Sequence, residues 1–353
     1  MLLVVNAGSS SIKVAIFDQH LVQSHATAVT EIGDAPRMGG HAVAAPDHAA
    51  AMGLILGDMA GAGWPLSRLT AAAHRIVHGG ADLTAPCRIT AGVEAAIEAL
   101  IPLAPLHNPA NLSAILALTE IAPDLPQYAS FDTGFHATNP DVALRYALPS
   151  AIEAEGIRRY GFHGLSYAAI VRKLPEISGE PLPKRLLALH LGNGASACAI
   201  LDGKSQASTM GYSPLDGLTM GTRAGSIDGN AVLRIAELHG IDGATRILNR
   251  ESGLLGLGGS NDMRTLHATN TVSARFAIQH FCYWTIRHAG SMIAAMGGLD
   301  AIAFTGGIGE NDAQIRTQIL QGLDFIAAGK PIWVIEADEE TQIAAEAMIL
   351  MHS

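Results

Sequence analysis

The sequence is poor in cysteine, and the few cysteines it has stand apart. Cys87, Cys198 and Cys282 are the only three among 353 residues, and no two of them form a CxxC pair. This pattern argues against a disulfide framework and against a cysteine-ligated zinc site. Fifteen histidines are present, but no HExxH string occurs, so that zinc-hydrolase motif is missing as well.

Long apolar runs and an excess of positive charge are also missing. No stretch approaches about 18 unbroken apolar residues, and the opening string MLLVVNAGSS has no basic leader. These features predict a cytoplasmic protein without a membrane partner. The formal net charge is -10, which argues against nucleic acid as the main partner.

The chain is long and rich in apolar residues. Hydrophobic residues make up 49% of its 353 residues and charged residues 15%, so a large core can be buried. The length exceeds that of one ordinary domain and predicts two.

One local pattern occurs twice: an apolar strand, a turn rich in glycine, serine or asparagine, and a second apolar strand. The turns lie at residues 6–13 and 190–197, and the two segments align without a gap at an offset of 184 (190 − 6). Identical residues in this alignment include the turn glycine and the closing aspartate. The repeat predicts a duplication, with two similar α/β domains facing each other across a cleft.

The turns themselves have the composition of a phosphate site. Glycine and serine let backbone N–H groups approach a phosphate, hydroxyls add donors, and Lys13 adds a positive charge. A plain surface hairpin is the alternative for one turn alone, and the second copy favours phosphate binding. A third glycine turn, at 306–311, follows the strand expected at 301–304. It indicates close backbone approach to a nucleotide, with a tight βα turn as the alternative.

Four single residues stand out by their setting. Arg75 and Arg223 lie beside glycines, where a guanidinium can face a carboxylate or phosphate, although each could form a surface ion pair instead. Asp132 ends the strand expected at 127–131 and could serve a metal site or cap a helix. His163, in RRYGFHG, could be functional or a buried structural histidine.

Taken together, these strings resemble the acetokinase family, nearly from end to end and in the family's order. The matching strings are NAGSSSIK, HRIVHGG, APLHNP, SFDTGFH, RRYGFHG, HLGNGAS, MGTRAG, SNDMR and FTGGIGEN. The resemblance implies the duplicated actin/sugar-kinase/Hsp70-like (ribonuclease H-like) α/β fold. It implies an N-terminal domain of residues 1–149 with the C-terminal helix 341–353, and a nucleotide-binding domain of residues 150–340. It also implies a homodimer, ATP or ADP as substrate, and Mg²⁺, which Mn²⁺ can replace.

The same resemblance implies roles for residues at matching positions. Metal binding falls to Asn6 and Glu339. The catalytic group would be Asp132, His163 and Arg223. The substrate carboxylate would bind Arg75, and its methyl group an apolar pocket of Val77, Leu106, Phe162 and Pro214. ATP would contact Lys13, His190, Leu191, Gly192, Asn193, Gly194, Asp262, Met263, Arg264, Gly307, Ile308, Gly309, Glu310 and Asn311.

The chain also differs from the family's usual strings. Ser226 stands where aspartate is usual, and Met263 replaces a phenylalanine near the adenine. Leu165 and Tyr167 occur in FHGLSY, where FHGTSH is commoner. The chain is also tens of residues shorter than is typical, with much of the loss expected between residues 20 and 70.

The implied reaction is reversible transfer of the γ-phosphoryl group of ATP to acetate, giving acetyl phosphate and ADP. A carboxylate is already anionic, so positioning and charge neutralisation should dominate, and Asp132 is expected to orient a metal or an arginine rather than act as a base. Direct in-line transfer is preferred, and a phosphorylated Glu339 stays open.

Other functions stay open at this point. Propionate or another short-chain carboxylate is an alternative substrate, since one methylene discriminates by only about 1–3 kcal/mol. An actin- or Hsp70-like ATPase module and a sugar or polyol kinase are further alternatives. The apolar residues beside Arg75 make a poor sugar site.

Overall fold

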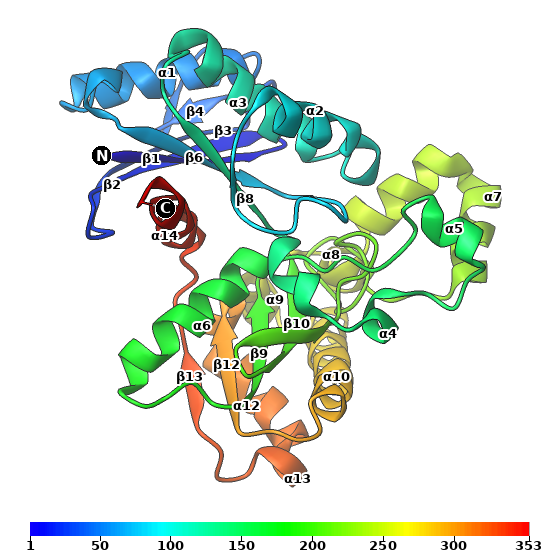
Figure 1. Cartoon of the computed structure of the whole chain (residues 1–353). Coiled ribbons are helices and arrows are strands. Elements are labelled where there is room, and N and C mark those ends of the chain that lie inside the picture. The colour runs from blue at the N-terminus through cyan, green and yellow to red at the C-terminus, as the bar shows by residue number, and fades with distance from the viewer. Residues whose placement is uncertain (353) are drawn as a thin grey trace. The chain divides into compact units, whose positions relative to one another are not determined.

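The computed structural model describes residues 1–352, which divide into two compact units. Unit 1 contains Met1–Phe135 and the C-terminal segment from Asp338 onward, and unit 2 contains His136–Ala337. Each unit is built around one β-sheet with helices packed on it (Figure 1). Each is described below by itself.

The two sheets share one topology. Unit 1 has eight strands in the order β5-β4-β3-β2-β1-β6-β8-β7, and unit 2 has five in the order β11-β10-β9-β12-β13. Five strands of unit 1, β3-β2-β1-β6-β8, correspond in order to the five strands of unit 2. In both sets the first three strands pair antiparallel with one another. The last two strands run parallel to the third strand. The predicted duplication is therefore confirmed at the level of topology.

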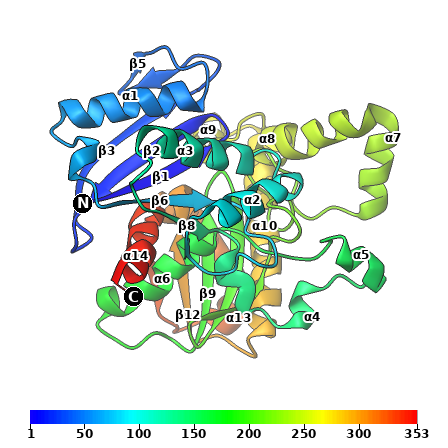
Figure 2. The same ribbon diagram turned by 45° about the horizontal axis from the view of Figure 1, so that its top comes forward.

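Unit 1 consists of β1 (Leu2–Gly8), β2 (Ser11–Phe17), β3 (Gln23–Thr30), β4 (Arg37–Met38), β5 (His41–Ala42), α1 (His48–Gly61), η1 (Leu66–Arg68), β6 (Ala71–Ile76), β7 (Cys87–Arg88), α2 (Ala91–Ala99), η2 (Ile101–Leu103), α3 (Asn108–Ile121), β8 (Gln127–Phe131) and α14 (Glu339–His352). Helices α1 and α3 cover one face of its sheet and α14 the other (Figures 1 and 2). The shortened region between residues 20 and 70 forms β3 to β5, α1 and η1.

Unit 2 consists of α4 (Asp141–Leu144), α5 (Ser150–Ala154), α6 (Gly164–Ser178), β9 (Arg185–Leu191), β10 (Ala195–Leu201), β11 (Lys204–Ser208), α7 (Gly229–Arg246), the π-helical η4 (Ile247–Glu251), α8 (Gly253–Gly258), α9 (Met263–Thr269), α10 (Val272–Ala295), β12 (Ala301–Thr305), α11 (Gly306–Asn311), α12 (Ala313–Gly322), α13 (Asp324–Ala327) and β13 (Ile332–Val334). The 3₁₀ segment η3 (Gly134–Thr138) spans the boundary between the units. Helices α6 and α10 flank the sheet of unit 2 (Figure 1).

The two repeated hairpins differ by one residue at the turn. In the first, Ala7 pairs with Ile12, and in the second the corresponding Leu191 pairs with Ala195. The gapless alignment is therefore wrong beyond the turn, where the pairing corresponds to an offset of 183 (195 − 12). A slip of one residue moves every side chain of a strand to the opposite face, so the identities found after the turn are not structurally equivalent positions.

The third glycine turn is the start of a helix. Gly306 has a φ of +79° and follows β12 directly, and α11 then runs through the expected turn residues. A Cβ on Gly306 would lie 2.8 Å from the Leu191 carbonyl oxygen, so only glycine lets α11 start this close to β9.

A buried histidine in β6 makes unit 1 sensitive to acid. Burial lowers the pKa of His74 from 6.5 to about 4, and the side chain is 1% exposed. As the pH falls, His74 is protonated in the unfolded chain before it is protonated in the folded unit. Its contribution to the unfolding free energy is therefore fully present above about pH 6.5 and is lost as the pH falls toward 4. Between pH 7 and 5 we expect His74 alone to cost about 2 kcal/mol of unfolding free energy.

The measurement is denaturant unfolding at pH 7 and 5, followed through Trp64 of unit 1. His74→Leu should reduce this pH dependence, and the exposed His41→Leu should not. An equal loss of unfolding free energy between pH 7 and 5 in wild type and in His74→Leu would contradict the role of His74. Burial also lowers the pKa of His78 to about 4, so part of the dependence should persist in His74→Leu.

Candidate functional site

Three predicted site residues of unit 1 lie at the carboxyl ends of neighbouring parallel strands. Asn6 is near the end of β1, Arg75 near the end of β6, and Asp132 directly follows β8. The Arg75 guanidinium donates from Nε to Asp132 Oδ1 (3.0 Å) and from Nη2 to Oδ2 (2.6 Å), a bidentate pair. Its Nη1 donates to Asn6 Oδ1 at 3.1 Å. Parallel strand ends thus bring together side chains from three distant segments.

The first turn of α14 completes this cluster with two carboxylates. Glu339 Oε2 lies 3.5 Å from Arg75 Nε, and Glu340 Oε1 accepts a hydrogen bond of 3.0 Å from Asn6 Nδ2. Glu339 was predicted from the resemblance. Glu340 was not singled out as a site residue, although the adjacent acidic pair was the available signal.

The charges of the cluster act strongly on one another. Burial acts to lower the pKa of Arg75, but the carboxylates of Asp132 and Glu339 raise it overall, so the guanidinium stays charged. Burial raises the pKa of Glu339; Arg75 and Lys13 oppose that shift, and the neighbouring carboxylates add to it. Lys13 is exposed on β2 and pairs across the hairpin with Asn6. The cluster carries more carboxylates than cations, which favours an added positive charge.

The loop after Arg75 is held by two buried asparagines of α3. Asn111 Oδ1 accepts from the Val77 backbone N–H at 3.0 Å, and Asn108 exchanges hydrogen bonds with the backbone of His78. Neither asparagine was predicted as a site residue, although Asn108 belongs to the APLHNP string. Of the predicted methyl pocket, unit 1 supplies Val77, which is buried, and Leu106, which is 43% exposed.

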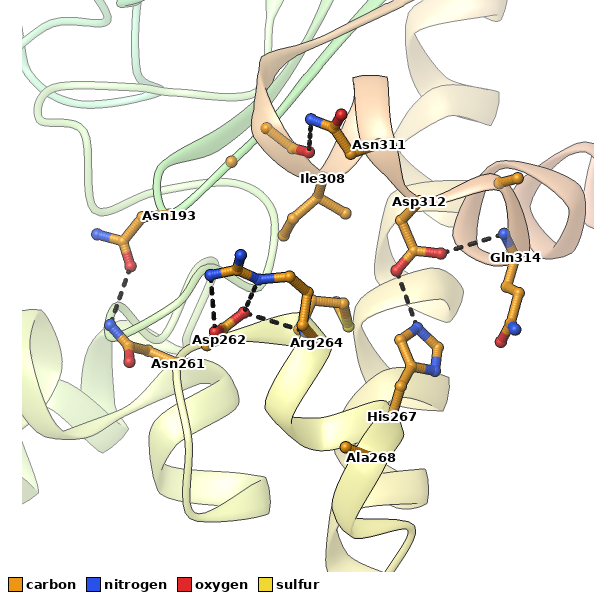
Figure 3. Close-up of a pocket in the computed structure, with 14 residues that line it drawn as sticks. Asn193, Asn261, Asp262, Arg264, His267, Ala268, Ile308, Asn311, Asp312 and Gln314 are labelled. Carbon is orange, nitrogen blue, oxygen red and sulfur yellow. Dashed lines mark hydrogen bonds and ion pairs between the residues drawn. The ribbon is translucent and has the colours of Figure 1, made fainter.

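Unit 2 contains a cavity of about 1100 Å³ between the second hairpin, α9 and α11. Figure 3 shows the side chains around it. The predicted ATP contacts that line it are Gly192, Asn193, Asp262, Met263, Arg264, Gly307, Ile308 and Asn311, and the unpredicted ones are Asn261, His267, Ala268, Asp312, Ala313 and Gln314. The size suits a nucleotide, and three separate strings converge on it.

Ion pairs shape the cavity wall. Asp262 caps α9 and forms a bidentate pair with the exposed Arg264, and His267 Nε2 lies 2.8 Å from Asp312 Oδ2 (Figure 3). His267 and Asp312 were missed because each lies just outside a matching string, His267 after SNDMR and Asp312 after FTGGIGEN. Helical spacing could have suggested His267, which is one turn after Met263.

Several predicted ATP contacts of unit 2 do not line this cavity. The side chain of Leu191 is fully buried, and Gly309 packs against its Cβ. Glu310 Oε1 accepts the backbone N–H groups of Gly306 and Ala337, each at 2.8 Å. The His190 ring is held by Ser166 Oγ at 2.9 Å. These residues therefore support neighbouring backbone and side chains instead of lining the cavity.

The turn of the second hairpin joins the cavity to two predicted catalytic side chains. A Cβ on Gly194 would lie 3.2 Å from His163 Nε2 and 3.6 Å from Arg223 Nη1. Gly192 and Asn193, the other two turn residues, line the cavity. The Gly221 backbone N–H donates to the Asn193 carbonyl oxygen at 2.9 Å, which ties the loop that carries Arg223 to the same turn. One three-residue turn therefore has the cavity on one side and a histidine and an arginine on the other.

Arg223 is a cation that lacks an anionic partner. Its Nη1 donates to the Pro214 carbonyl oxygen at 3.1 Å, and no carboxylate of residues 1–352 forms an ion pair with it. Burial lowers its pKa, the sign of a charge held away from water. An unpaired, partly buried guanidinium is a strong indication of an anion site.

His163 is held from several sides. It has left-handed backbone angles (φ 59°, ψ 22°) and precedes α6. Its Nδ1 lies 2.8 Å from Ser196 Oγ, and its ring stacks on His190 with centroids 4.1 Å apart. The neighbouring Phe162 is buried, and its carbonyl oxygen contacts His136 Nε2 at 2.9 Å. His163 is thus half-buried and held in one orientation by its neighbours.

Membrane-spanning helices and clusters of metal-binding side chains are not found among residues 1–352. No helix there is both long and apolar enough to cross a bilayer. No group of three or more His, Cys, Asp or Glu side chains is arranged there to hold a metal ion by itself.

Sequence comparison places these features in a known family. The model of the acetokinase family matches residues 1–347. The acetate kinase of Methylocella silvestris is 41% identical over 392 aligned positions, which cover 98% of this chain and 97% of that protein. Because 392 positions exceed the 353 residues of this chain, the alignment contains gaps, as expected for a shortened chain.

Solved structures agree. The acetate kinase of Porphyromonas gingivalis superposes with a TM-score of 0.90 at 32% identity and 99% coverage of both chains. A propionate kinase from Francisella tularensis gives 0.91 at 33% identity and 98% coverage of both. A putative N-acetylmannosamine kinase from Listeria monocytogenes shares the fold alone, at a TM-score of 0.52 and 11% identity. The predicted duplicated actin/sugar-kinase/Hsp70-like fold is confirmed, and the chain belongs to the acetokinase family.

Proposed function

We propose that this protein transfers the γ-phosphoryl group of ATP reversibly to acetate, giving acetyl phosphate and ADP. The observation that carries the proposal is the turn 192–194, which borders the nucleotide-sized cavity and also contacts His163 and the unpaired Arg223. A nucleotide seated in the cavity would direct its phosphates along this turn. Backbone N–H groups, a histidine and an arginine suit the charge of a transferring phosphoryl group.

In unit 1, Arg75 is proposed to bind the acetate carboxylate, and Asp132 to hold Arg75 in place. The bidentate pair fixes the plane of the guanidinium, so a carboxylate arriving at Arg75 meets a preset orientation. Asp132 has no need to act as a base, because acetate is already ionised at neutral pH. This geometry supports the orienting role expected for Asp132.

The residues around Asn6 fit a magnesium ion. The carboxamide oxygen of Asn6 and the carboxylates of Glu339 and Glu340 are hard oxygen donors, and Mg²⁺ prefers one or two carboxylates completed by water and substrate phosphates. Asn6, Glu339 and Glu340 are proposed to hold the ion, which supplies charge neutralisation for the phosphates of ATP. Lys13 adds a further positive charge on the same hairpin.

Direct in-line transfer is the proposed route. Arg75 orients the nucleophilic carboxylate, and Arg223, His163 and the turn 192–194 stabilise the charge that spreads over the transferring group. Glu339 is not required as a nucleophile, because its carboxylate faces Arg75 and so serves the charge balance of unit 1.

Acetate is proposed as the preferred carboxylate, with propionate as the second candidate. The propionate kinase and the acetate kinase superpose equally well on this chain, so overall similarity does not separate the two substrates. Of the residues predicted for the methyl pocket, unit 2 supplies Phe162 and Pro214. Phe162 is 2% exposed, and the Pro214 carbonyl oxygen is bound by Arg223, so neither residue can move aside freely.

The test is formation of acyl hydroxamate from acetate, propionate and butyrate, measured in parallel with MgATP and hydroxylamine. We expect the highest kcat/KM with acetate, less product with propionate and least with butyrate. Omission of Mg²⁺ should abolish product. No acyl phosphate from any carboxylate would contradict the proposed function, and ATP hydrolysis that ignores added carboxylate would favour an ATPase module.

A cytoplasmic homodimer is proposed for the assembled enzyme. Three large apolar side chains, Val272, Phe276 and Tyr283, recur at helical spacing on α10 and are 78%, 53% and 60% exposed. A second copy of this chain would cover such a stripe. Cytoplasmic ATP and ADP as substrates support the location.

A further inference from the structure

Tyr167 is connected to His163 through one buried serine. The Tyr167 phenol oxygen lies 2.5 Å from Ser196 Oγ, and Ser196 Oγ lies 2.8 Å from His163 Nδ1. Tyr167 and Ser196 are both fully buried. The three groups form a short chain of hydrogen bonds that ends on the ring edge opposite Nε2, the atom near Gly194.

Local structure explains why these groups meet. His163 immediately precedes α6, and Tyr167 lies one helical turn later, with its backbone N–H donating to the His163 carbonyl oxygen at 3.1 Å. Residues four apart lie on the same side of a helix. Ser196 pairs with His190 across β9 and β10, so Ser196 and His190 project from the same face of the sheet.

The direction of the hydrogen bonds follows from the surroundings of the phenol. Burial raises the pKa of Tyr167 well above its ordinary value, so the group stays protonated. The His190 backbone N–H donates to the phenol oxygen, which leaves the phenol proton for Ser196. Ser196 can then donate its own proton to His163 Nδ1, and the ring proton of a neutral His163 sits on Nε2.

We propose that Tyr167 is a positioning residue that acts through Ser196 to hold the His163 ring with its Nε2–H toward the turn 192–194. There the imidazole can donate a hydrogen bond to the transferring phosphoryl group. The inference rests on the proposed function for the role of that hydrogen bond. Tyr167 is also a position at which this chain departs from the commoner string FHGTSH, so the arrangement belongs to this sequence in particular.

The hydroxyl of Tyr167 can be separated from its packing. The ring packs edge-on against His136, with centroids 5.7 Å apart, and phenylalanine would keep that contact. Tyr167→Phe keeps the ring but removes the hydroxyl, and with it the donor to Ser196 and the acceptor of the His190 backbone N–H. Ser196→Ala breaks the same chain at its middle and serves as an independent second variant. Tyr160→Phe is the matched control, since Tyr160 is also buried in unit 2 but donates to the Gly156 carbonyl oxygen instead.

The experiment measures kcat, KM for ATP and acetate, and the pH dependence of kcat for the full-length variants. We expect Tyr167→Phe to lower kcat about 10- to 100-fold, as loss of a supporting partner typically does, with both KM values within about threefold of wild type. The pH profile of kcat should shift as well. The double variant with Ser196→Ala should be no slower than Ser196→Ala alone, because both break one chain. Tyr160→Phe should match wild type.

A second readout does not depend on activity. In protein labelled with ¹⁵N-histidine, long-range ¹H–¹⁵N spectra report which ring nitrogen of His163 carries the proton. We expect the Nε2–H form in wild type and a mixture with Nδ1–H in Tyr167→Phe. Wild-type kcat and an unchanged tautomer in Tyr167→Phe, with only a lower Tm, would overturn the proposal and leave Tyr167 a packing residue. If wild type makes no acyl phosphate, the proposed function fails, while the tautomer measurement still decides the positioning of His163.

Discussion

Replacing Arg223 with glutamine is expected to lower kcat about 10³-fold. The guanidinium lies near Gly194, in the turn that borders the nucleotide cavity, and has no carboxylate partner in residues 1–352. Its charge is thus available for negative charge that develops on the transferring oxygens. Glutamine keeps much of the length and a hydrogen-bond donor but loses the charge. Arg223→Lys should fall between the two, because it keeps the charge without the planar fork.

Stability should respond differently from activity. Since Arg223 is a partly buried cation without an anionic partner, its removal relieves a desolvation cost, and the Tm of Arg223→Gln should not fall. The matched control is Arg234→Gln on α7, whose partner is the exposed Glu237 and whose loss should leave kcat unchanged. Initial rates at saturating MgATP and acetate, with a thermal melt of each variant, decide the matter. A kcat within tenfold of wild type would remove Arg223 from the proposed mechanism.

Asp132→Asn is expected to have the second largest effect, on activity and stability together. The change keeps the shape of the side chain but removes the charge that pairs with Nε and Nη2 of Arg75. Arg75 then has only Asn6 and the more distant Glu339 to orient it. We expect kcat to fall about 10²-fold through misplacement of the acceptor, and the unfolding free energy of unit 1 to fall by about 2–3 kcal/mol.

The chain offers a close control for this variant. Arg185 pairs with Asp300 through the same two nitrogens, at 3.1 and 2.7 Å, but both side chains are about one-third exposed. Asp300→Asn should cost less than about 1 kcal/mol, since exposed pairs contribute little, and should leave kcat unchanged. The rates are compared at saturating Mg²⁺, so that metal affinity does not hide the effect. Near-normal turnover of Asp132→Asn under that condition would refute the orienting role of Asp132.

Much of the candidate site could be predicted because each residue sits in a string with a distinctive composition. In the sequence, Arg75 and Arg223 lie in glycine-containing strings and Asp132 at a strand end. In the structure, Arg75 and Asp132 lie at the carboxyl ends of β6 and β8, and Arg223 lies beside the turn at Gly194. Residue type and place in the chain carry that information. The duplicated topology could likewise be predicted, because the repeated hairpin is also visible as residue types at fixed places in the chain.

The direction of side chains could not be predicted in this way. Glu310 lies inside a glycine string that borders the cavity, yet its carboxylate turns back to two backbone N–H groups. His190 likewise turns to Ser166. His267 joins its cluster through helix geometry, one turn after Met263, which the matching strings do not show, whereas Glu340 stands next to the predicted Glu339. The hairpin register was mistaken because apolar β-strands match one another in either frame, and only the turn length decides between them.

That register has an evolutionary consequence. Before the turn the offset stays 184, so Asn6 corresponds to His190, and after the turn it is 183, so Lys13 corresponds to Ser196. After duplication, one ancestral cross-strand pair therefore took on two kinds of chemistry. The first copy became an amide beside an ammonium group, suited to a cation and an anion. The second became an imidazole beside a hydroxyl, suited to moving or directing a proton. The equivalent cross-strand pairs of the two hairpins therefore carry different chemistry in the two halves of the chain.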